Sequence, residues 1–479
     1  MILEPNDSDL AEAREKSSAD SARTLAQNMA SSAQSLAGNP LNNFKTFIQF
    51  KMLMFFLNRP NLISKKRFEK YTRLAAKRDP KRFTQFVEAI TGVETTASSV
   101  VFKGSHRASE YTEYDSLLKP VETDIRLIAF YLPQYHPFPE NDGWWGKGFT
   151  EWTNVGKALP LFEGHYQPHC PIHLGYYDLR LDEVMEEQSK IARQYGIAGF
   201  AHHFYWFGGK TLMELPLQNM LKNQAVDIPF CISWANENWT RRWDGKDSEV
   251  LIAQRYSQQD ARQMIQHLAN YFKDDRYIRI NGRPVFIVYH PRMIPEVEEM
   301  KNIWQDEAMN LGIGPLYIIG AQKDLSDDFQ KIGFDASVQF PPHGMDTMNL
   351  APAQNWLKAD PSARVYDYES VAANALAVQN EEVKIFRSVT LSWDNTARRQ
   401  TGATILVNFS INAYRSWLSQ LCQRLRRDPT LTPDEKIIFI NAWNEWAEGT
   451  HLEPDQRFGF AYLEATRQAL TGPSDDKDA

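Results

Sequence analysis

The chain contains little cysteine, no signal-like N-terminus and no excess of positive charge. Its 479 residues include three cysteines, and Cys170, Cys231 and Cys422 show neither paired nor metal-ligand spacing. This excludes a disulfide framework and favours a reducing compartment. Residues 1–7 lack a basic and then apolar pattern, and the most apolar early run, residues 47–57, is too short to span a bilayer. We therefore predict a soluble, cytoplasmic protein. The net charge of -7 excludes general affinity for nucleic acid.

Three motifs that carry common chemistries are also missing. No Gly-x-Gly-x-x-Gly loop follows the first predicted strand, so a dinucleotide-binding sheet has no support. No Gly-x-Ser-x-Gly elbow is present for serine chemistry. Asp-x-Asp triplets occur only in the polar tails, at residues 7–9 and 476–478, so the metal anchor of the usual sugar-nucleotide transferase is missing. His202 and His203 are adjacent and point to opposite sides of a strand, so we expect no metal there and no cofactor.

Composition divides the chain into four parts. Residues 1–40 are rich in Ser, Ala, Asp and Asn and are predicted to be a disordered tail, as is the polar end at 472–479. Residues 41–123 are predicted to be a helical extension and linker. Within them, residues 41–95 carry an apolar stripe at helical spacing and a basic end, which fits helices docked on the main domain, or a membrane-surface or protein partner. Residues 124–471 form the main domain.

From Asp124 onward, short apolar runs alternate regularly with amphipathic segments. Eight strands alternating with helices predict an α/β fold, a (β/α)8 TIM barrel, with a doubly wound sheet as the alternative. Ser257 with Asp260 resembles a capping box that opens one of the helices. The predicted strands are residues 125–131, 196–201, 228–234, 284–289, 316–320, 334–340 and 383–393, and the run that starts at Lys436.

The eighth strand ends in the densest cluster of reactive side chains. Glu445 and Glu448 follow it directly, and if the chain turns helical there, their Cβ atoms lie roughly 5–6 Å apart on one side. Two carboxyl groups so close suit an acid and a base or nucleophile, and roughly 5–5.5 Å separates this pair in retaining glycosidases. Trp443 and Trp446 offer flat apolar faces on which sugar rings stack. An ordinary solvated turn is the alternative.

Polar and aromatic side chains follow the other predicted strands as well. In a barrel, the side chains just after each strand share one rim, which is where active sites lie. Indoles, amides, imidazoles and carboxylates together suit a polyhydroxylated ligand, so we predict an oligosaccharide or polysaccharide substrate. The predicted substrate-binding residues are Trp144, Trp145, His202, His203, Trp206, Trp234, Asn236, Glu237, Trp393, Asp394, Asn444 and Trp446, beside the catalytic pair Glu445 and Glu448.

Four long motifs resemble those of a known family. They are residues 129–136 (Ala-Phe-Tyr-Leu-Pro-Gln-Tyr-His), 144–154, 234–239 (Trp-Ala-Asn-Glu-Asn-Trp) and 441–454. They resemble the WbsX-type proteins, a bacterial group labelled glycosyltransferases and associated with O-antigen and other surface-polysaccharide (lipopolysaccharide) loci. The resemblance covers roughly residues 124–470. That group is similar to glycoside hydrolase family 99, the endo-α-mannosidases, which are (β/α)8 barrels.

The second resemblance implies roles for the two glutamates. The segment Trp-Asn-Glu-Trp-x-Glu-Gly-Thr of family 99 is matched at residues 443–450. By that match, Glu445 assists the sugar 2-hydroxyl as internal nucleophile through a 1,2-anhydro intermediate. Glu448 is the general acid that protonates the leaving oxygen and later activates the acceptor. This route keeps the two-carboxylate logic and the retention of configuration.

Three functions remain open from the sequence. The leading hypothesis is an enzyme that cleaves or transfers a glycosidic bond with retention in surface-polysaccharide metabolism. The second is a glycosyltransferase that uses a sugar nucleotide or lipid-linked sugar, whose phosphates Arg241 and Arg242 would meet. The third is a non-catalytic glycan-binding protein, in which substitution of Glu445 or Glu448 would leave binding intact.

Overall fold

The computed structural model describes residues 107–241, 246–378, 383–399 and 401–472. The predicted N-terminal tail and helical extension lie outside the described residues up to residue 106, and so does the C-terminal tail from residue 473. The described part of the predicted linker packs on the main domain. Tyr114 stacks on Phe460 with ring centroids 4.8 Å apart, and the Ala108 amide donates to the Arg457 carbonyl at 2.8 Å.

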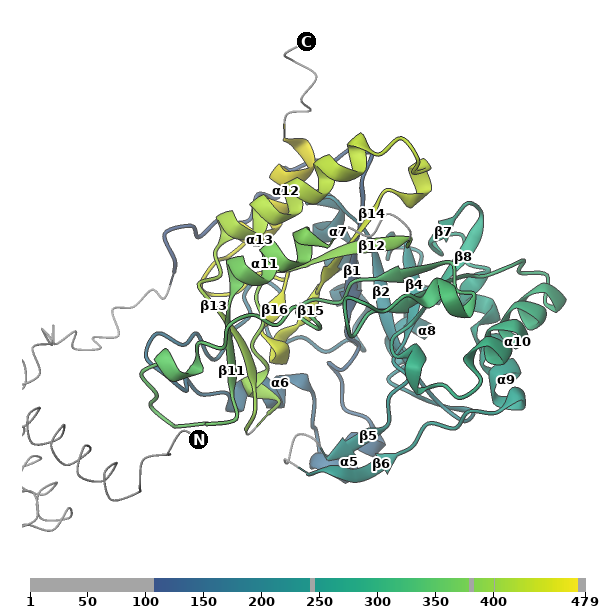
Figure 1. Cartoon of the computed structure of the whole chain (residues 1–479), viewed down its shortest axis with the longest axis horizontal. Helices are drawn as coiled ribbons and strands as arrows, with labels where there is room; N and C mark the ends of the chain where they lie inside the picture. Colours follow the sequence, from purple (N-terminus) through teal and green to yellow (C-terminus); the bar gives the residue numbers. More distant parts are fainter. Residues whose placement is uncertain (1–106, 242–245, 379–382, 400, 473–479) are drawn as a thin grey trace, which may run out of the picture. The chain divides into compact units, whose positions relative to one another are not determined.

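Eight parallel strands close into a barrel, as predicted (Figure 1). Each strand pairs with the next, and the circle closes because the first strand, β1, pairs with both β2 and β14. The strands are fully buried over most of their length, which explains their unbroken apolar sequences. In chain order they are β1 (Arg126–Tyr131), β2 (Ile197–Phe207), β4 (Phe230–Trp234), β8 (Arg283–Val288), β9 (Tyr317–Ala321), β10 (Ala336–Val338), β12 (Ile385–Thr390) and β14 (Ile437–Asn441).

Helices follow most strands and cover the outside of the barrel (Figure 1). Ser257 caps α9 by accepting the Asp260 amide, but the Asp260 carboxylate accepts the Trp206 indole instead of closing the predicted capping box. The helices after successive strands are α7 (Asp182–Gln194), α8 (Leu215–Lys222), α9 (Gln258–Phe272), α10 (Val297–Asn310), α11 (Tyr368–Ala377), α12 (Ile411–Arg427) and α13 (Ala461–Thr471), with the 3-10 helix η4 (Phe329–Ile332) between β9 and β10.

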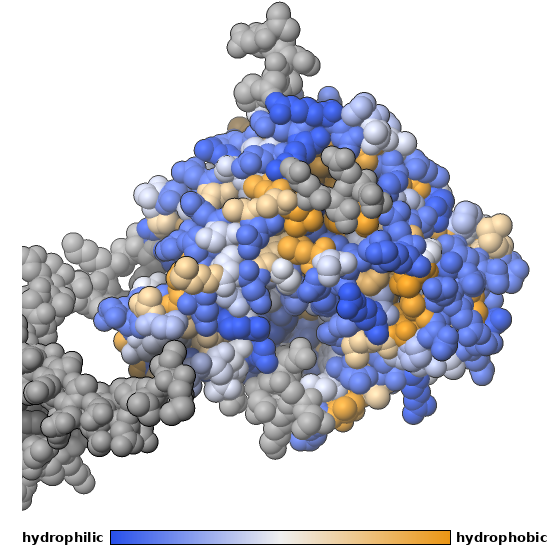
Figure 2. Space-filling model, in the orientation of Figure 1, coloured by the Kyte–Doolittle hydropathy of each residue, from blue (hydrophilic) through white to orange (hydrophobic). Residues whose placement is uncertain are grey.

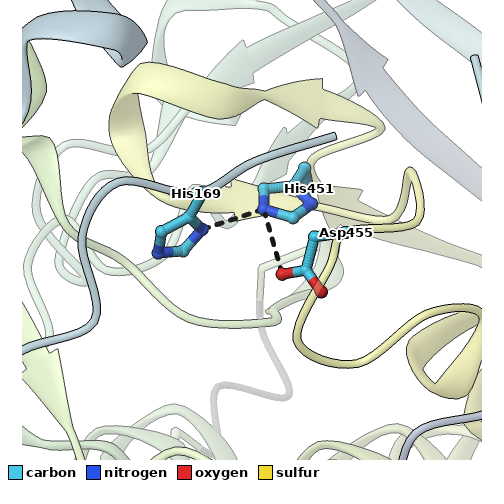
Figure 3. Close-up of side chains that lie close together, drawn as sticks. All are labelled: His169, His451 and Asp455. Atoms are coloured by element: carbon cyan, nitrogen blue, oxygen red, sulfur yellow. Dashed lines mark hydrogen bonds and ion pairs between the residues drawn. The ribbon is translucent and has the colours of Figure 1, made fainter. Parts of the chain in front are cut away.

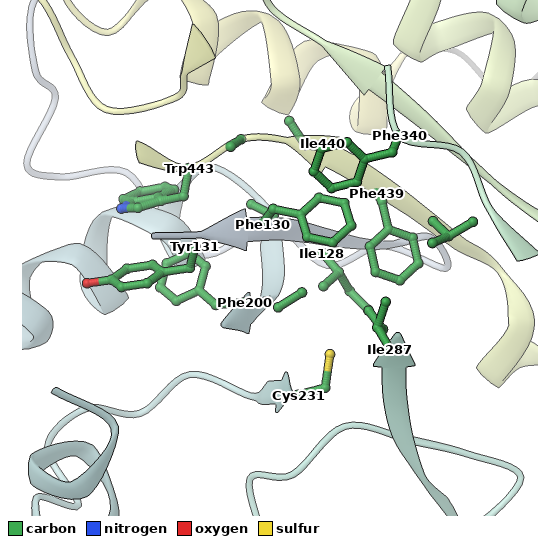
Figure 4. Packing of buried hydrophobic residues seen from close by; sticks show 14 of the residues in the cluster. Ile128, Phe130, Tyr131, Phe200, Cys231, Ile287, Phe340, Phe439, Ile440 and Trp443 are labelled. Carbon is green, nitrogen blue, oxygen red and sulfur yellow. The ribbon is translucent and has the colours of Figure 1, made fainter. Parts of the chain in front are cut away.

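Aromatic rings from several strands fill the barrel interior (Figure 4). Phe130 of β1 lies 4.7 Å from Phe340 and 5.4 Å from Phe439 of β14, measured between ring centroids. Phe130 also stacks on His203 of β2 at 5.8 Å. These rings form the floor beneath the rim at which the strands end.

Several short elements are built on that rim. Helix α6 (Glu151–Lys157) follows β1, the 3-10 helix η6 (Asn395–Ala397) follows β12, and β15 (Asn444–Glu445), the 3-10 helix η8 (Trp446–Glu448) and β16 (Thr450–His451) follow β14. A separate lobe contains α5 (Pro139–Trp145) beside the hairpin of β5 (Trp239–Arg241) and β6 (Lys246–Ile252) (Figure 1). The remaining strands are β3 (Lys210–Leu212), β7 (Arg279–Ile280), and the pair β11 (Arg364–Asp367) and β13 (Thr404–Val407).

The face of the molecule in Figure 2 is mostly hydrophilic, with hydrophobic residues gathered in small patches. Among the described residues, no helix has both the length and the apolar character needed to cross a membrane.

Candidate active site

One arginine holds three carboxyl groups together at the rim. Arg398 donates from Nη2 to Oε2 of Glu445 and from Nη1 to Oε1 of Glu448, both at 2.8 Å. Its Nε donates to Oε1 of Glu151 at 2.8 Å, and Nη2 lies 2.5 Å from the same oxygen. The Glu445 and Glu151 side chains are buried, whereas 21% of the Glu448 side chain is exposed. All three acids therefore meet on a single guanidinium, and Glu448 is the one that solvent reaches.

The three acids and the arginine come from three neighbouring strands. Glu151 begins α6 after β1, Arg398 follows η6 after β12, and Glu445 and Glu448 lie at the two ends of η8 after β14. Strands β1, β14 and β12 are adjacent in the barrel. The predicted turn after β14 is a 3-10 turn, in which residues three apart lie one above the other, so both glutamates reach the same side.

Burial dominates the electrostatics of the two predicted catalytic carboxyl groups. It raises the pKa of Glu445 to about 8, although Arg398 opposes the shift and the neighbouring Glu448 adds to it. Burial also raises the pKa of Glu448, again against the effect of Arg398. The carboxylates in turn hold the pKa of Arg398 well above its usual value against its burial. The pair therefore keeps a proton at pH values at which an ordinary glutamate has lost it.

His203 is the second predicted residue that the fold brings to the acids. Its Nε2 lies 3.8 Å from Oε1 of Glu445, and its pKa is lowered to about 3 by burial and by the charges of Arg398 and Lys323. The ring is therefore neutral at physiological pH. Tyr205 lies two residues along the same strand, and the Glu445 charge raises its pKa beyond the effect of burial.

Three of the predicted substrate-binding residues point away from this site. The second strand does not end at residue 201 as predicted but continues to Phe207, so its side chains alternate between the interior and the helices. His202 lies 4.4 Å from the Tyr131 ring, and the Trp206 indole donates to Asp260 of α9 at 2.9 Å. Trp234 packs edge-on against Trp304 of α10 at 5.9 Å. His202, Trp206 and Trp234 therefore face the surrounding helices, and their role in substrate binding stays a prediction.

The tryptophans that flank the glutamates are buried rather than available to a sugar. Trp443 and Trp446 are both at most 1% exposed, and both indoles donate to the buried carboxyl group of Glu453, at 3.0 and 2.7 Å. Trp446 also stacks on His451 at 3.7 Å. Neither ring presents an exposed face, and the predicted stacking of sugar on them stays a prediction. They act as a hydrogen-bonded support beneath the turn that carries the acids.

Two predicted amide side chains have structural partners. Asn444 is buried and exchanges hydrogen bonds with the backbone of Leu132, at 2.7 and 3.0 Å, which ties the turn to the end of β1. Asn236 is buried and bonds in the same way to the backbone of His290. Both side chains brace rim loops through these backbone hydrogen bonds, and their direct role in substrate binding stays a prediction.

Other predicted residues lie where a ligand could meet them. Trp144 and Trp145 are half-buried on α5, and Trp144 packs at 5.7 Å from Trp239, which in turn lies 5.3 Å from Tyr205. These rings form an aromatic wall from the α5 lobe to Tyr205 of β2. Glu237 is half-buried in the loop after β4.

Trp393 and Asp394 line a cavity of about 360 Å³ on the other side of η6. The Leu161 amide donates to Nδ1 of His165, so the Nε2 proton of His165 faces Asp394 at 2.5 Å. Gln167 donates to the same carboxylate at 2.7 Å. Burial raises the pKa of Asp394, but the hydrogen bonds from His165 and Gln167 hold this pKa below its usual value.

The turn that carries Glu448 is fixed against Asp394. The Asp394 amide donates to the Glu448 carbonyl at 2.7 Å, and Gly449 adopts φ +63° with no room for a Cβ, which would lie 2.9 Å from the Asp394 side chain. A glycine is therefore required at the residue after the second acid.

Sequence reasoning missed the arginine that organises the site. Arg398 was not among the predicted residues, and Glu151 entered only as part of the motif at residues 144–154. A physical signal was present for a cation, because buried carboxylates need a positive partner. Nothing in the sequence says which of the 53 lysines and arginines supplies it.

The fold and site together define a (β/α)8-barrel protein with an acid cluster at the carboxyl ends of its strands. The sequence model of the family described as "Glycosyltransferase WbsX" matches residues 127–466. The chain therefore belongs to the WbsX glycosyltransferase family.

Two curated relatives are similar over most of the chain. Both are described as "Uncharacterized protein WxcX", from Xanthomonas campestris pv. campestris strains B100 and ATCC 33913, and each is 42% identical over 374 residues. The alignment covers 78% of this chain and 53% of each relative, so the chain spans about half the length of the curated relatives it matches.

Two solved structures are also similar. The GH99 endo-alpha-mannosidase from Bacteroides thetaiotaomicron has a TM-score of 0.44 and 16% identity, covering 73% of this chain and 97% of that chain. A structure described as "Glycoside hydrolase-like protein" has a TM-score of 0.47 and 12% identity, covering 76% and 99%.

Proposed function

We propose that the protein is a carbohydrate-active enzyme that cleaves or transfers a glycosidic bond with retention, in bacterial surface-polysaccharide metabolism. The observation that carries this proposal is the convergence of Glu445 and Glu448 on Arg398 at the catalytic rim of the barrel. Two carboxyl groups that share one site and one proton are what acid–base chemistry at a glycosidic bond requires. The proposed substrate is an oligosaccharide or polysaccharide.

The proposed roles follow the family 99 resemblance and the different exposure of the two acids. Glu448, the more exposed, protonates the oxygen of the leaving sugar. Glu445, the more buried, takes the proton from the sugar 2-hydroxyl as that oxygen attacks the anomeric carbon. In the second half, Glu448 removes the proton of the acceptor, which attacks the same carbon and opens the three-membered ring. Glu445 then returns its proton to the 2-oxygen, so both acids end as they began.

The raised pKa of Glu448 supports its role as general acid, because a general acid must be protonated at working pH. Glu445 must begin as a carboxylate to accept the 2-hydroxyl proton, and its burial raises its pKa against that role. Arg398, at 2.8 Å, opposes this shift and stabilises the Glu445 carboxylate. Glu151 provides the arginine with a second anchor, which fixes the guanidinium between the two reacting acids.

The proposed sugar contacts are the remaining predicted side chains of the rim, of which Trp144, Trp145 and Glu237 are half-buried and His203, Trp393 and Asp394 are buried. Trp144 and Trp145 on α5 would stack on sugar rings. His203 is neutral and offers a hydrogen bond beside Glu445. Glu237, Trp393 and Asp394 complete the proposed set.

The test uses the sugar polymer of the source bacterium. A strain carrying Glu448→Gln should lose the normal surface polysaccharide on gels, and purified wild-type protein, but not the variant, should act on the extracted glycan. Glu464→Gln on α13, whose carboxylate accepts a hydrogen bond from Gln468 of the same helix, is the matched control and should leave both unchanged. Release of free oligosaccharide identifies a hydrolase. A normal polymer and unchanged binding in both Glu445→Gln and Glu448→Gln would show a non-catalytic glycan-binding protein instead.

A second candidate is a glycosyltransferase that uses a sugar nucleotide or lipid-linked sugar, which the family's description favours. The same acids would then direct the sugar to an acceptor hydroxyl. Addition of sugar to the glycan without release of oligosaccharide, together with protection of the protein from proteolysis by the activated donor, would establish this alternative.

A further inference from the structure

Two histidines and an aspartate form a second buried cluster outside the arginine-centred site (Figure 3). His169 lies in the loop between α6 and α7, and His451 and Asp455 follow the turn η8, which carries Glu448. Nδ1 of His169 lies 2.9 Å from Nε2 of His451, which lies 3.9 Å from Oδ2 of Asp455. We propose that these three side chains bind a divalent first-row transition-metal ion, for which Zn²⁺ is the probe. The proposal is independent of the proposed glycan chemistry.

The ligand atoms are oriented by groups behind them. Nδ1 of His451 faces the Glu453 carbonyl at 2.8 Å, so its proton lies there and the lone pair of Nε2 points into the cluster. Oδ1 of Asp455 accepts the amides of Arg457 and Phe458, at 3.0 and 2.6 Å, which turns Oδ2 towards His451. Partners of this kind fix the tautomer and direction of metal ligands.

The chemistry of the donors suits such an ion. Two imidazole nitrogens and one carboxylate oxygen form a set that binds Zn²⁺ and neighbouring metals rather than Mg²⁺ or Ca²⁺. All three side chains are buried, at 3% exposed for His169, 5% for His451 and 3% for Asp455, so protein groups surround the donor atoms.

The spacing requires only a small adjustment. The three ligand atoms lie within 4.8 Å of one another. Zinc bonds of roughly 2.0–2.2 Å at tetrahedral angles place two ligand atoms about 3.4 Å apart, so side-chain movements of up to about 1 Å would close the site. The fourth position has room, because His169 and Tyr166 line the cavity of about 360 Å³ from which water or a sugar hydroxyl can approach.

A direct hydrogen bond is the alternative explanation. The Nδ1 proton of His169 can be donated to Nε2 of His451, and Tyr166 already donates to Oδ2 of Asp455 at 2.9 Å. In that case the cluster only ties the α6–α7 loop to the segment after the acids, and no metal binds. In the proposed site the His169 proton moves from Nδ1 to Nε2, and the ion bound between the ligands links the α6–α7 loop to the segment after the acids.

Metal titration of the full chain separates the two explanations. After dialysis against a chelator, wild-type protein should bind one equivalent of Zn²⁺ in isothermal titration calorimetry, and His169→Gln should weaken that binding at least about 100-fold. Tyr166→Phe should weaken it about 10-fold by removing a partner of Asp455. Cys170→Ser and His173→Gln, which alter neighbouring metal-binding residue types on the same loop, should bind as the wild type does.

The outcomes that overturn the proposal are equally definite. Absence of a bound equivalent in the wild type, or unchanged binding by His169→Gln, would leave the hydrogen-bonded cluster as the explanation. Should His169→Gln fail to fold, X-ray absorption at the zinc edge of the wild-type protein decides the matter. Two imidazole ligands with oxygen and no sulfur are expected, and a sulfur ligand or a purely oxygen shell would contradict the site.

Discussion

Removing Arg398 tests whether one cation holds the acid cluster together. Raising the pKa of Glu445 from its usual 4.5 to about 8 corresponds to roughly 5 kcal/mol, at about 1.4 kcal/mol per pH unit. The folded state holds this proton more tightly than the unfolded chain, so its contribution to stability is present below pH 4.5 and is lost as the pH rises to about 8. Arg398→Met removes the positive charge that stabilises the ionised Glu445 and so limits the loss of stability at high pH. The variant should therefore be destabilised much more at high pH than at low pH.

The expected size follows from the number of acids left without a partner. At pH 8.5, uncompensated buried carboxylates should cost about 3–5 kcal/mol, which is roughly 4–7 °C in Tm for a domain of this size. At pH 5 Glu445 and Glu448 can be neutralised by protons, and the loss should be about 1 kcal/mol. Arg398→Lys, which keeps the charge but not the fork of donors, should lie between the two.

Thermal unfolding followed by circular dichroism at both pH values is the assay. Arg415→Met on α12, where the guanidinium bonds to Gln468 and Asn412 at the surface, is the matched control and should lose little at either pH. Equal losses for Arg398→Met at pH 5 and pH 8.5 would refute the electrostatic reasoning. They would show that the arginine matters through packing alone.

Three further predictions concern the neighbourhood of the acids. Activity on the extracted glycan should decline above about pH 8, because the Glu445–Glu448 pair then loses its last proton; a profile of kcat/KM against pH checks this. Gly449→Ala should lower stability by about 1–3 kcal/mol in urea unfolding, because its φ of +63° is strained for alanine and a Cβ would meet Asp394. Trp206→Phe should lower stability by about 1 kcal/mol and leave kcat and KM unchanged, since the indole faces α9; a changed KM would return Trp206 to the substrate side.

The fold was predictable because each strand is a short apolar run bounded by a helix of clear periodicity. Strand β14 illustrates this, since the unbroken run from Ile437 to Ile440 is buried on both faces, as such runs are in parallel sheets. The pairing of acids after it was predictable for the same reason: a barrel places everything that follows its strands on one rim. The spacing of Glu445 and Glu448 also predicted that both face one side, because residues three apart lie on the same side in an α-helix and in a 3-10 helix.

The site was less predictable where side-chain direction depends on where a strand ends. His203 and His202 are neighbours in sequence, yet one faces Glu445 and the other faces the helices, because β2 continues six residues beyond its predicted end at residue 201. Aromatic composition misled in a related way. The sequence around Trp446 predicts a ring on which a sugar stacks, but the Trp446 indole donates a hydrogen bond to the buried carboxyl group of Glu453.

Charge balance at the rim bears on the choice between the proposed glycan substrate and an activated sugar donor. Three carboxyl groups surround one guanidinium, so Arg398 has no positive charge to spare for a phosphate. A diphosphate bound directly beside Glu448 would meet net repulsion, whereas a neutral sugar would meet hydrogen-bond donors, acceptors and an aromatic wall. Besides Arg398, the described residue Lys323 also acts on this site, because its positive charge lowers the pKa values of both His203 and Glu448. An activated donor would therefore have to place its phosphates on the Lys323 side, away from Arg398, while a glycan substrate can use the whole rim.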